Sequence, residues 1–154
     1  MRADAFTPAD AAAVSALIAR ALRESNAADY PPEEIDRLVL LHTPERVREM
    51  FAEGPGLVIR EDGGVTGAAR LTPSREKPGE WWLRTVFVYP EKQGCGIGRA
   101  LVERLEASAR ERGAKTLRLG ASKTAHGFYR RLGYRDMGPE CDADGLFPME
   151  KVLA

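Results

Sequence analysis

The sequence predicts one mixed α/β domain built around a single sheet, and three observations lead to that prediction. The chain has 154 residues, about the size of one globular domain. Hydrophobic residues make up 44% and charged residues 30%, which is typical of a folded protein. Stretches with helical spacing alternate with strand-like stretches, and no linker, repeat or low-complexity segment separates them. We therefore expect residues 1–154 to form a single domain.

Helices are predicted for most of the first third of the chain. Apolar residues recur at helical spacing over Ala9–Glu24, with Thr7 as a cap and Pro8 at the first helical position. A second helix is expected over Pro32–Leu41, and a short third one lies within Thr43–Gly54. These helices must pack their apolar sides on the strands that follow.

Strands and helices alternate through the rest of the sequence. Residues 57–60 and 65–72 flank Glu61-Asp62-Gly63-Gly64, which is typical of a β-hairpin turn. Trp81–Tyr89 is the strongest strand pattern, with Trp81 and Trp82 on opposite faces, one in the core and one toward a substrate. The remaining expected elements are a helix from about Gly98 to Arg112, a strand over Thr116–Gly120, a helix over His126–Arg131, and strands near Tyr134–Met137 and Leu146–Leu153.

Several function classes find no support in the composition. No apolar run approaches the length of a membrane helix, and no basic segment precedes an apolar core as in a signal peptide. Cys95 and Cys141 are isolated in the sequence, so no disulfide framework is predicted. The chain has only two histidines, His42 and His126, and the spacing of these four residues predicts no metal site. We expect a cytoplasmic protein that binds no metal and no membrane.

Charge is unevenly distributed although the net charge is zero. Residues 1–90 hold 11 basic and 14 acidic residues, residues 91–135 hold 11 and 4, and residues 136–154 hold 1 and 5. The basic middle segment lacks the interleaved aromatic residues of a nucleic-acid surface, so nucleic acid is not an expected partner. Long helices that carry solvated arginines explain part of the bias. The remainder suits a polyanionic ligand, and the acidic first 90 residues would then face a cationic substrate.

A glycine-rich turn connects the strongest strand to the longest helix. In Gln93-Gly94-Cys95-Gly96-Ile97-Gly98, alternate glycines permit positive φ and a close approach of a ligand to the backbone. The helix that follows directs free N–H groups to the same place, which favours a phosphate or pyrophosphate. The dinucleotide-binding fingerprint fails at Arg99, and Gly98-Arg99-Ala100 lacks the Lys of a nucleoside-triphosphate loop.

The turn resembles the acetyl-coenzyme A signature of the GNAT superfamily of N-acetyltransferases. That signature reads Gln/Arg-x-x-Gly-x-Gly/Ala after a strand ending in Val-x-Pro, and Val88-Tyr89-Pro90 with Gln93-x-x-Gly96-x-Gly98 matches every fixed position. Phe128-Tyr129-Arg130-Arg131-Leu132-Gly133-Tyr134 is similar to a second family signature, Phe-Tyr-x-x-x-Gly-Phe/Tyr. Together the two motifs cover residues 80–135. The resemblance implies the acyl-coenzyme A N-acyltransferase fold, a mostly antiparallel central sheet with helices on both faces.

One position departs from the family pattern. Many relatives have Asn seven residues before the tyrosine, where this chain has Ser122. The surrounding residues 120–125, Gly-Ala-Ser-Lys-Thr-Ala, resemble a small bacterial subgroup, as does Tyr30-Pro31-Pro32-Glu33-Glu34-Ile35. The substrates of that subgroup are diverse or undefined, so this similarity names no acceptor.

The resemblance implies a role for each matched residue. Backbone N–H groups of the turn would hold the pyrophosphate, and the edge of the strand ending at Val88 would pair with the pantetheine arm. A main-chain N–H near Val88 would stabilise the oxyanion, and Tyr129 would give a proton to the leaving thiolate. Val88 and Tyr129 are thus the predicted catalytic residues. Predicted cofactor-binding residues are Phe87, Val88, Gln93, Gly94, Cys95, Gly96, Ile97, Gly98, Arg99, Ser122 and Tyr129.

The sequence leaves the general base unassigned. Glu80, Glu33, Asp29 and Tyr30 lie in segments that could line the acceptor side, and nothing ranks them. His126 is one turn before Tyr129, but a lone His on a short helix is more often a polar surface residue. Cys95 has no His or Asp partner spaced to activate it, which favours direct transfer over an acetyl-enzyme.

The predicted function is transfer of an acetyl group from acetyl-coenzyme A to a primary amine by direct attack in a ternary complex. The expected acceptor is a small molecule or, alternatively, a peptide. A non-catalytic acyl-coenzyme A-binding regulatory module is the alternative, since the motif residues would serve either. Members of the family often dimerise, so a homodimer is compatible with the sequence. Acyl-chain preference and oligomeric state are not readable from these residues.

Overall fold

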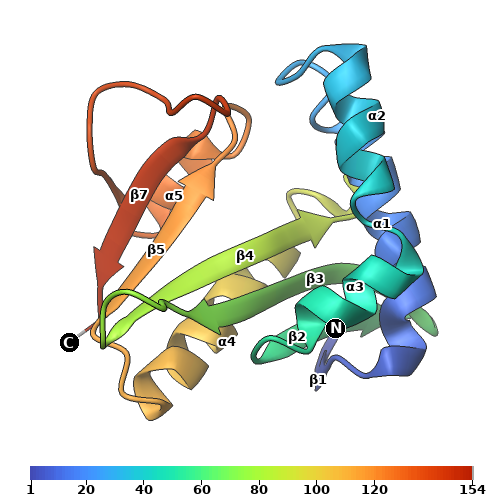
Figure 1. Cartoon of the computed structure of the whole chain (residues 1–154). Helices are drawn as coiled ribbons and strands as arrows, with labels where there is room; N and C mark the ends of the chain where they lie inside the picture. Colours follow the sequence, from blue (N-terminus) through green and yellow to red (C-terminus); the bar gives the residue numbers. More distant parts are fainter. Residues whose placement is uncertain (154) are drawn as a thin grey trace.

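Seven strands form one mixed sheet in the computed structural model, which describes residues 1–153 (Figure 1). Their order is β1-β2-β3-β4-β5-β7-β6; β4 and β5 are parallel and every other neighbouring pair is antiparallel. The predicted mostly antiparallel sheet is therefore confirmed. The strands are β1 (Arg2–Ala5), β2 (Gly56–Glu61), β3 (Gly64–Pro73), β4 (Glu80–Val88), β5 (Thr116–Ala121), β6 (Arg135–Asp136) and β7 (Phe147–Val152).

Helices cover both faces of this sheet, as predicted. Helix α4 packs on one face against β2, β3 and β4, and α1 packs on the other against β3 and β4. Each face has its own apolar core, one around Leu101 and Leu105 of α4 and one around Leu17 and Ile18 of α1. The helices are α1 (Ala11–Glu24), α2 (Pro32–Leu40), α3 (Pro44–Phe51), α4 (Ile97–Glu111) and α5 (His126–Arg131), with 3-10 turns at Pro8–Asp10 and Pro90–Lys92.

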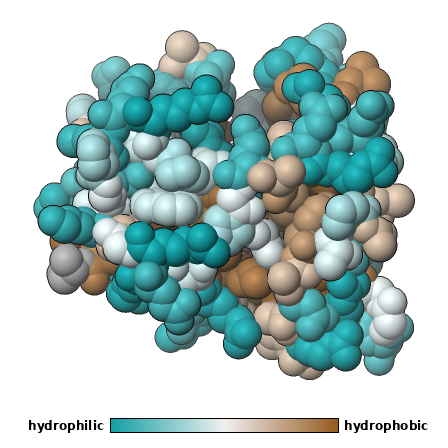
Figure 2. Space-filling view, turned by 60° about the horizontal axis from the view of Figure 1, so that its bottom comes forward, coloured by the Kyte–Doolittle hydropathy of each residue, from teal (hydrophilic) through white to brown (hydrophobic). Residues whose placement is uncertain are grey.

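Figure 2 shows one face of the molecule on which hydrophilic residues predominate and hydrophobic residues gather in a narrower band. Across residues 1–153, no helix is both long enough and apolar enough to span a membrane.

The N-terminal segment differs from the prediction in two ways. Residues Arg2–Ala5 form the edge strand β1, which pairs with β2 and which the sequence did not indicate. Helix α1 begins at Ala11 rather than Ala9, because Pro8–Asp10 first makes a 3-10 turn. The Asp10 carboxylate accepts a hydrogen bond from the N–H of Thr7 at 2.9 Å. Thr7 therefore caps the 3-10 turn rather than helix α1 itself.

The β2–β3 hairpin is confirmed with its turn chemistry. Asp62 and Gly63 have φ of +51° and +81°, and positive φ at both central residues is the geometry that matches the twist of a two-residue hairpin. An Asp-Gly pair tolerates that backbone, so the local sequence determines this turn.

A bulge in β4 borders the opening that contains the site. Ala68 of β3 lies opposite Phe87, whereas Arg70 lies opposite Arg84, so β4 has one extra residue there. The extra residue falls at Thr85, whose φ of +56° is unusual for a β-branched side chain. Arg70 donates from Nε to the Thr85 hydroxyl at 2.8 Å and so supports this conformation.

Strands β4 and β5 pair only at their first three residues. Glu80–Trp82 face Thr116–Arg118, and beyond that point the two strands diverge, as Figure 1 shows. The second half of β4 thus keeps its hydrogen bonds to β3 and has a free edge toward β5. This V-shaped gap lies in the middle of the sheet, between the N-terminal and C-terminal halves of the fold.

Candidate active site

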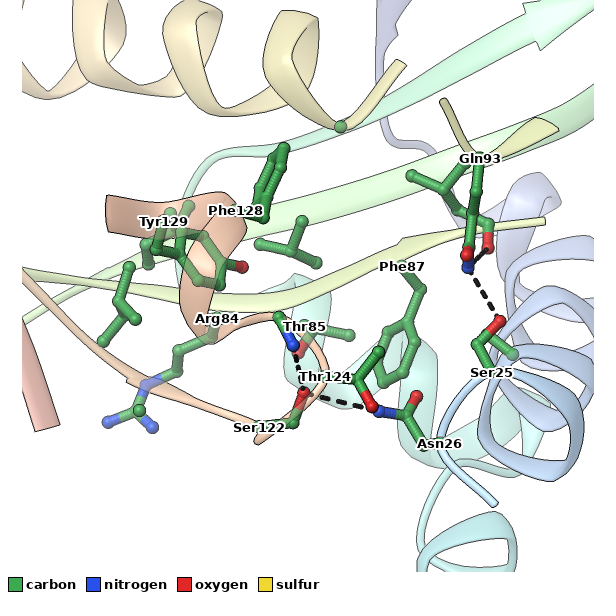
Figure 3. Close-up of a pocket in the computed structure, with 18 of the residues that line it drawn as sticks. Ser25, Asn26, Arg84, Thr85, Phe87, Gln93, Ser122, Thr124, Phe128 and Tyr129 are labelled. Atoms are coloured by element: carbon green, nitrogen blue, oxygen red, sulfur yellow. Dashed lines mark hydrogen bonds between the residues drawn. The ribbon is translucent and has the colours of Figure 1, made fainter. Parts of the chain in front are cut away.

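A cavity of about 700 Å³ occupies the gap between β4 and β5. Its walls come from the end of α1, from β4, from the turn before α4, from the β5–α5 connection and from the β6–β7 loop (Figure 3). Residues from both predicted motifs meet here, including Val88, Gly96 and Tyr129. The structure therefore brings together segments that the sequence analysis could connect only through a resemblance.

The glycine turn presents a row of free N–H groups. Gly94 and Gly96 have φ of +82° and +86°, and an added Cβ at either position would meet no atom within 4 Å. Gly96 precedes α4, whose first backbone bond runs from the N–H of Ala100 to the Gly96 carbonyl at 3.0 Å. Within the described chain, the N–H groups from Gly94 to Arg99 donate to no backbone carbonyl. Free donors at a helix start form a site for an anion.

The side chains of the turn have roles distinct from its backbone. Ile97 is buried in the core of the α4 face, and Arg99 is exposed and pairs with Glu103. Gln93 donates from Nε2 to Ser25 Oγ at 2.7 Å and lies 3.5 Å from the Val88 carbonyl oxygen. Cys95 is exposed, with its sulfur 4.0 Å from the Gln93 carbonyl oxygen. Any anion contact by Cys95 or Ile97 would thus come from the main chain.

Gly98 serves the packing of two helices. An added Cβ there would lie 3.1 Å from the ring of Phe128 and 3.7 Å from Val88. The absence of a side chain lets the start of α4 approach α5 closely. This proximity places the glycine turn beside the second motif.

The free edge of β4 offers a donor at the predicted position. The N–H of Tyr89 donates to the Thr66 carbonyl at 2.9 Å, on the β3 side. Because donors alternate along a strand, the N–H of Val88 points to the opposite side, into the gap. Phe87 also lines the cavity and packs against the core of the α1 face.

Tyr129 combines burial with an unpartnered hydroxyl. It is 6% exposed, and its ring packs edge-to-face with Phe128 at 5.0 Å and with Tyr134 at 5.8 Å. Its hydroxyl points into the cavity in Figure 3 and has no hydrogen-bond partner among residues 1–153. Burial raises the pKa of Tyr129 well above its usual value, so the phenol stays protonated at neutral pH.

Ser122 lines the cavity but directs its hydroxyl to neighbouring protein groups. Its Oγ accepts the N–H of Ala125 at 3.2 Å and lies 3.4 Å from the donor Nδ2 of Asn26. Asp29 Oδ1 accepts from the backbone and hydroxyl of Thr124 at 3.0 and 2.8 Å. The α1–α2 loop is thus tied to the β5–α5 connection, a contact across more than 90 residues that no sequence pattern announced.

The structure separates the candidates for a general base. Asp29 accepts a hydrogen bond from the Thr124 hydroxyl. The Glu80 carboxylate lies 3.7 Å from the Arg118 guanidinium, at the end of β4 that pairs with β5. Neither Glu80 nor Glu33 lines the cavity. Tyr30 does line it, but burial and then Asp29 raise the pKa of its phenol, which disfavours it as a base.

Two further polar residues, Asp142 and His126, lie in or near the cavity wall. Among the cavity-lining residues the one carboxylate is Asp142, which the sequence analysis did not single out and which accepts the N–H groups of Asp144 and Leu146 at 2.9 Å. His126 lies outside the cavity, bonded to Asp136 and stacked on Phe147 at 4.1 Å. The expectation that His126 is a polar surface residue is correct only in that it lies outside the cavity, because its side chain is largely buried between Asp136 and Phe147.

The prediction of an acidic acceptor wall is wrong. The residues that positions 1–90 contribute to the cavity include Arg70 and Arg84 and no carboxylate. The acidic residues of this half lie elsewhere, because mean charge along a sequence does not fix which side chains a cleft collects. Of the two tryptophans, Trp81 packs against the core and Trp82 lines the cavity, as expected.

Comparison with known proteins agrees with this geometry. The sequence pattern of a family described as an acetyltransferase (GNAT) domain matches residues 26–153. The chain belongs to the GNAT acetyltransferase family. It is therefore an enzyme of the transferase class, as the two motifs predicted.

Individual relatives place the chain within that family. It is 33% identical over 114 residues to an IAA acetyltransferase of Azospirillum brasilense, which covers 72% of this chain and 71% of that protein. It spans about half the length, 46%, of uncharacterized acetyltransferases from Streptococcus pyogenes.

Solved structures share the fold over nearly the whole chain. The PaiA N-acetyltransferase of Thermoplasma acidophilum, in complex with coenzyme A, has a TM-score of 0.85 at 18% identity and covers 99% of both chains. A GNAT acetyltransferase of Brucella melitensis in complex with acetyl-CoA has a TM-score of 0.71 at 26% identity, covering 99% of this chain and 88% of that one.

Proposed function

We propose that this acetyltransferase moves the acetyl group of acetyl-coenzyme A to a primary amine of a small molecule by direct attack in a ternary complex. The observation that carries the proposal is the unpartnered hydroxyl of Tyr129, which points into a cavity bordered by the glycine turn and the free edge of β4. The relatives of this fold that were solved with coenzyme A and acetyl-CoA support the same donor.

The glycine turn is the part of the cavity that suits the diphosphate of the donor. Its N–H groups from Gly94 to Arg99 are free, and Lys92 and Arg99 line the same end of the cavity. The pantetheine arm can then extend along the free edge of β4 as an added strand would. This places the thioester near Val88.

The reaction forms a C–N bond and breaks a C–S bond. The neutral amine attacks the thioester carbonyl carbon, and the Val88 N–H stabilises the oxygen on which negative charge develops, a contribution of about 3–4 kcal/mol in comparable sites. The C–S bond then breaks and Tyr129 donates its proton to the sulfur, while the amine loses a proton to water. That proton returns from water to the Tyr129 phenolate, which regenerates the phenol. No residue forms a covalent intermediate.

The alternative of a non-catalytic binding module has less support. A binding role does not require the Tyr129 hydroxyl to lie without a protein partner in the cavity. Such an arrangement suits a group that finds its partner only in the reacting complex.

A first test measures release of free coenzyme A thiol from acetyl-coenzyme A with a panel of alkyl, aryl and peptidyl amines. We expect release with some amines and intersecting initial-rate patterns, as direct attack requires. Cys95→Ser should keep kcat within about twofold of the parent, because the Cys95 thiol has no activating partner. Parallel initial-rate lines, or loss of activity in Cys95→Ser, would contradict direct transfer.

The pH dependence of kcat provides a second test. A phenol is neutral when protonated, so burial disfavours its ionised form and raises the pKa of Tyr129. The proton donor is then present across the neutral and mildly alkaline range. With both substrates saturating, kcat should rise as the bound amine deprotonates and show no descending limb below about pH 10, the ordinary phenol value. A descending limb near pH 8 would exclude Tyr129 as the donor.

A further inference from the structure

Basic side chains line the cavity in two separate places. Lys92 and Arg99 flank the glycine turn, where the proposed function places the diphosphate, and Arg131 lines the cavity as well as a smaller pocket that it shares with Arg99. Arg70 and Arg84 line it from the middle of β3 and β4. Arg84 lies four residues before Val88, about 13 Å back along the strand at roughly 3.3 Å per residue. A donor that enters from the turn reaches Val88 first, so it leaves this second group unused.

Only one guanidinium of the second group lacks an anionic partner. Arg70 pairs with Glu53 at 2.8 Å and also donates to the Met50 carbonyl. Arg118, which flanks the same Trp82, lies 3.7 Å from Glu80. Within residues 1–153, no carboxylate lies within ion-pair distance of Arg84, which is exposed to solvent.

The position of Arg84 is nevertheless fixed. Its Nε donates to Thr72 Oγ1 at 3.0 Å, and its guanidinium carbon lies 4.9 Å from the centre of the Trp82 ring. Neither terminal nitrogen has a hydrogen-bond partner among residues 1–153. Figure 3 shows the side chain extended from β4, with these nitrogens away from the other labelled residues. A planar guanidinium held at Nε presents two parallel donors, the arrangement that binds a carboxylate.

We propose that the acceptor is an amine that also carries a carboxylate, and that Arg84 binds this carboxylate while the amine reaches the thioester near Val88. The inference rests on the proposed function, because it names the class of acceptor for the same cavity. The single carboxylate that lines the cavity, Asp142, leaves its electrostatic balance positive, which favours an acceptor with an anionic group. Arg84 is a specificity residue and takes no part in bond formation.

The test compares matched acceptors that differ only in the anionic group. β-Alanine, ε-aminocaproate and 8-aminooctanoate, which span increasing distances between amine and carboxylate, are each paired with the corresponding amide, whose amine is the same distance from a neutral end. With the parent enzyme we expect kcat/KM to favour the acid by about tenfold to a hundredfold, the usual range for a charged hydrogen bond. In Arg84→Gln the ratio of kcat/KM for the acid to kcat/KM for the amide should fall to near one. We expect this fall to come from a higher KM for the acid, with kcat and the rate with amides unchanged.

Two variants control for charge and geometry. Arg104→Gln removes the same charge from the exposed side of α4, outside the cavity, and should keep the parent's preference. Arg84→Lys keeps the positive charge at this position but lacks the two parallel donors. It should therefore retain only part of the parent's preference for the acid.

Each outcome decides between the two proposals. If the parent transfers acetyl groups equally to acids and amides, or if Arg84→Gln keeps the preference, the carboxylate inference is overturned and the proposed function stands. If only amines without a carboxylate are acetylated, the carboxylate inference is likewise overturned and the proposed function stands. If acetyl-coenzyme A binds but no amine of any class releases thiol, the proposed function fails and this inference fails with it.

Discussion

Replacing Gly96 by Glu should abolish acetyl-coenzyme A binding while the protein remains folded. Gly96 has φ of +86° at the start of α4, and its N–H belongs to the free row of the glycine turn. A side chain there meets no atom within 4 Å, so the cost to folding is the left-handed backbone, about 1–2 kcal/mol. The added carboxylate would occupy the anion site, and we expect affinity to fall at least about a hundredfold by calorimetry.

The opposite end of the same helix offers a matched control. Gly113 follows α4 with φ of +83°, also has no atom within 4 Å of an added Cβ, and lies outside the cavity. Gly113→Glu therefore carries the same substitution and a similar backbone cost. It should bind acetyl-coenzyme A as the parent does. Gly96→Ala separates the effect of backbone from that of charge. Unchanged binding in a folded Gly96→Glu protein would show that the turn does not hold the diphosphate.

The second large effect is expected for Tyr129→Phe. Removing the phenol leaves the departing thiolate without its donor, and general acid catalysis by a positioned side chain contributes about a hundredfold or more. We expect kcat to fall by about that factor, with the affinity for acetyl-coenzyme A within about twofold of the parent, since Tyr129 acts on the bond that breaks. Thermal unfolding should be unchanged, because the hydroxyl has no hydrogen-bond partner among residues 1–153 and the aromatic packing survives.

A neighbouring tyrosine provides the reverse case. Tyr134 packs edge-to-face on Tyr129, but its hydroxyl donates to the buried Glu106 at 2.8 Å. Tyr134→Phe should lower the free energy of unfolding by about 1–2 kcal/mol while kcat of the folded enzyme changes little. If Tyr129→Phe loses stability and retains kcat, Tyr129 is a packing residue and another group protonates the thiolate.

Local sequence patterns predicted most of the elements. The helix over residues 126–131 has its expected bounds, and the Asp62-Gly63 turn makes the expected hairpin. These features depend on backbone preferences of neighbouring residues, which a sequence displays directly. Strand β1 was missed because its four residues include Arg2 and Asp4, and it exists only by pairing with β2.

The candidate site was predicted unevenly for the same reason. The glycine turn and the tyrosine motif are contiguous segments, so their spacing was visible in the sequence. The contact of Asn26 with Ser122 joins residues 96 positions apart, and Asp142 and Arg84 enter the cavity from different loops and strands. Such contacts depend on packing between elements, which periodicity does not encode.

The sequence by itself determined the mixed α/β class, the two motifs and hence the acetyltransferase family, because each rests on short-range spacing. The tertiary structure decided what surrounds the reacting groups. Strand β4 diverges from β5 after Trp82, and the cavity between them collects basic residues from a half of the chain that is acidic on average. Charge summed along a chain says how much charge is present, whereas only the fold sets which side chains face the substrate.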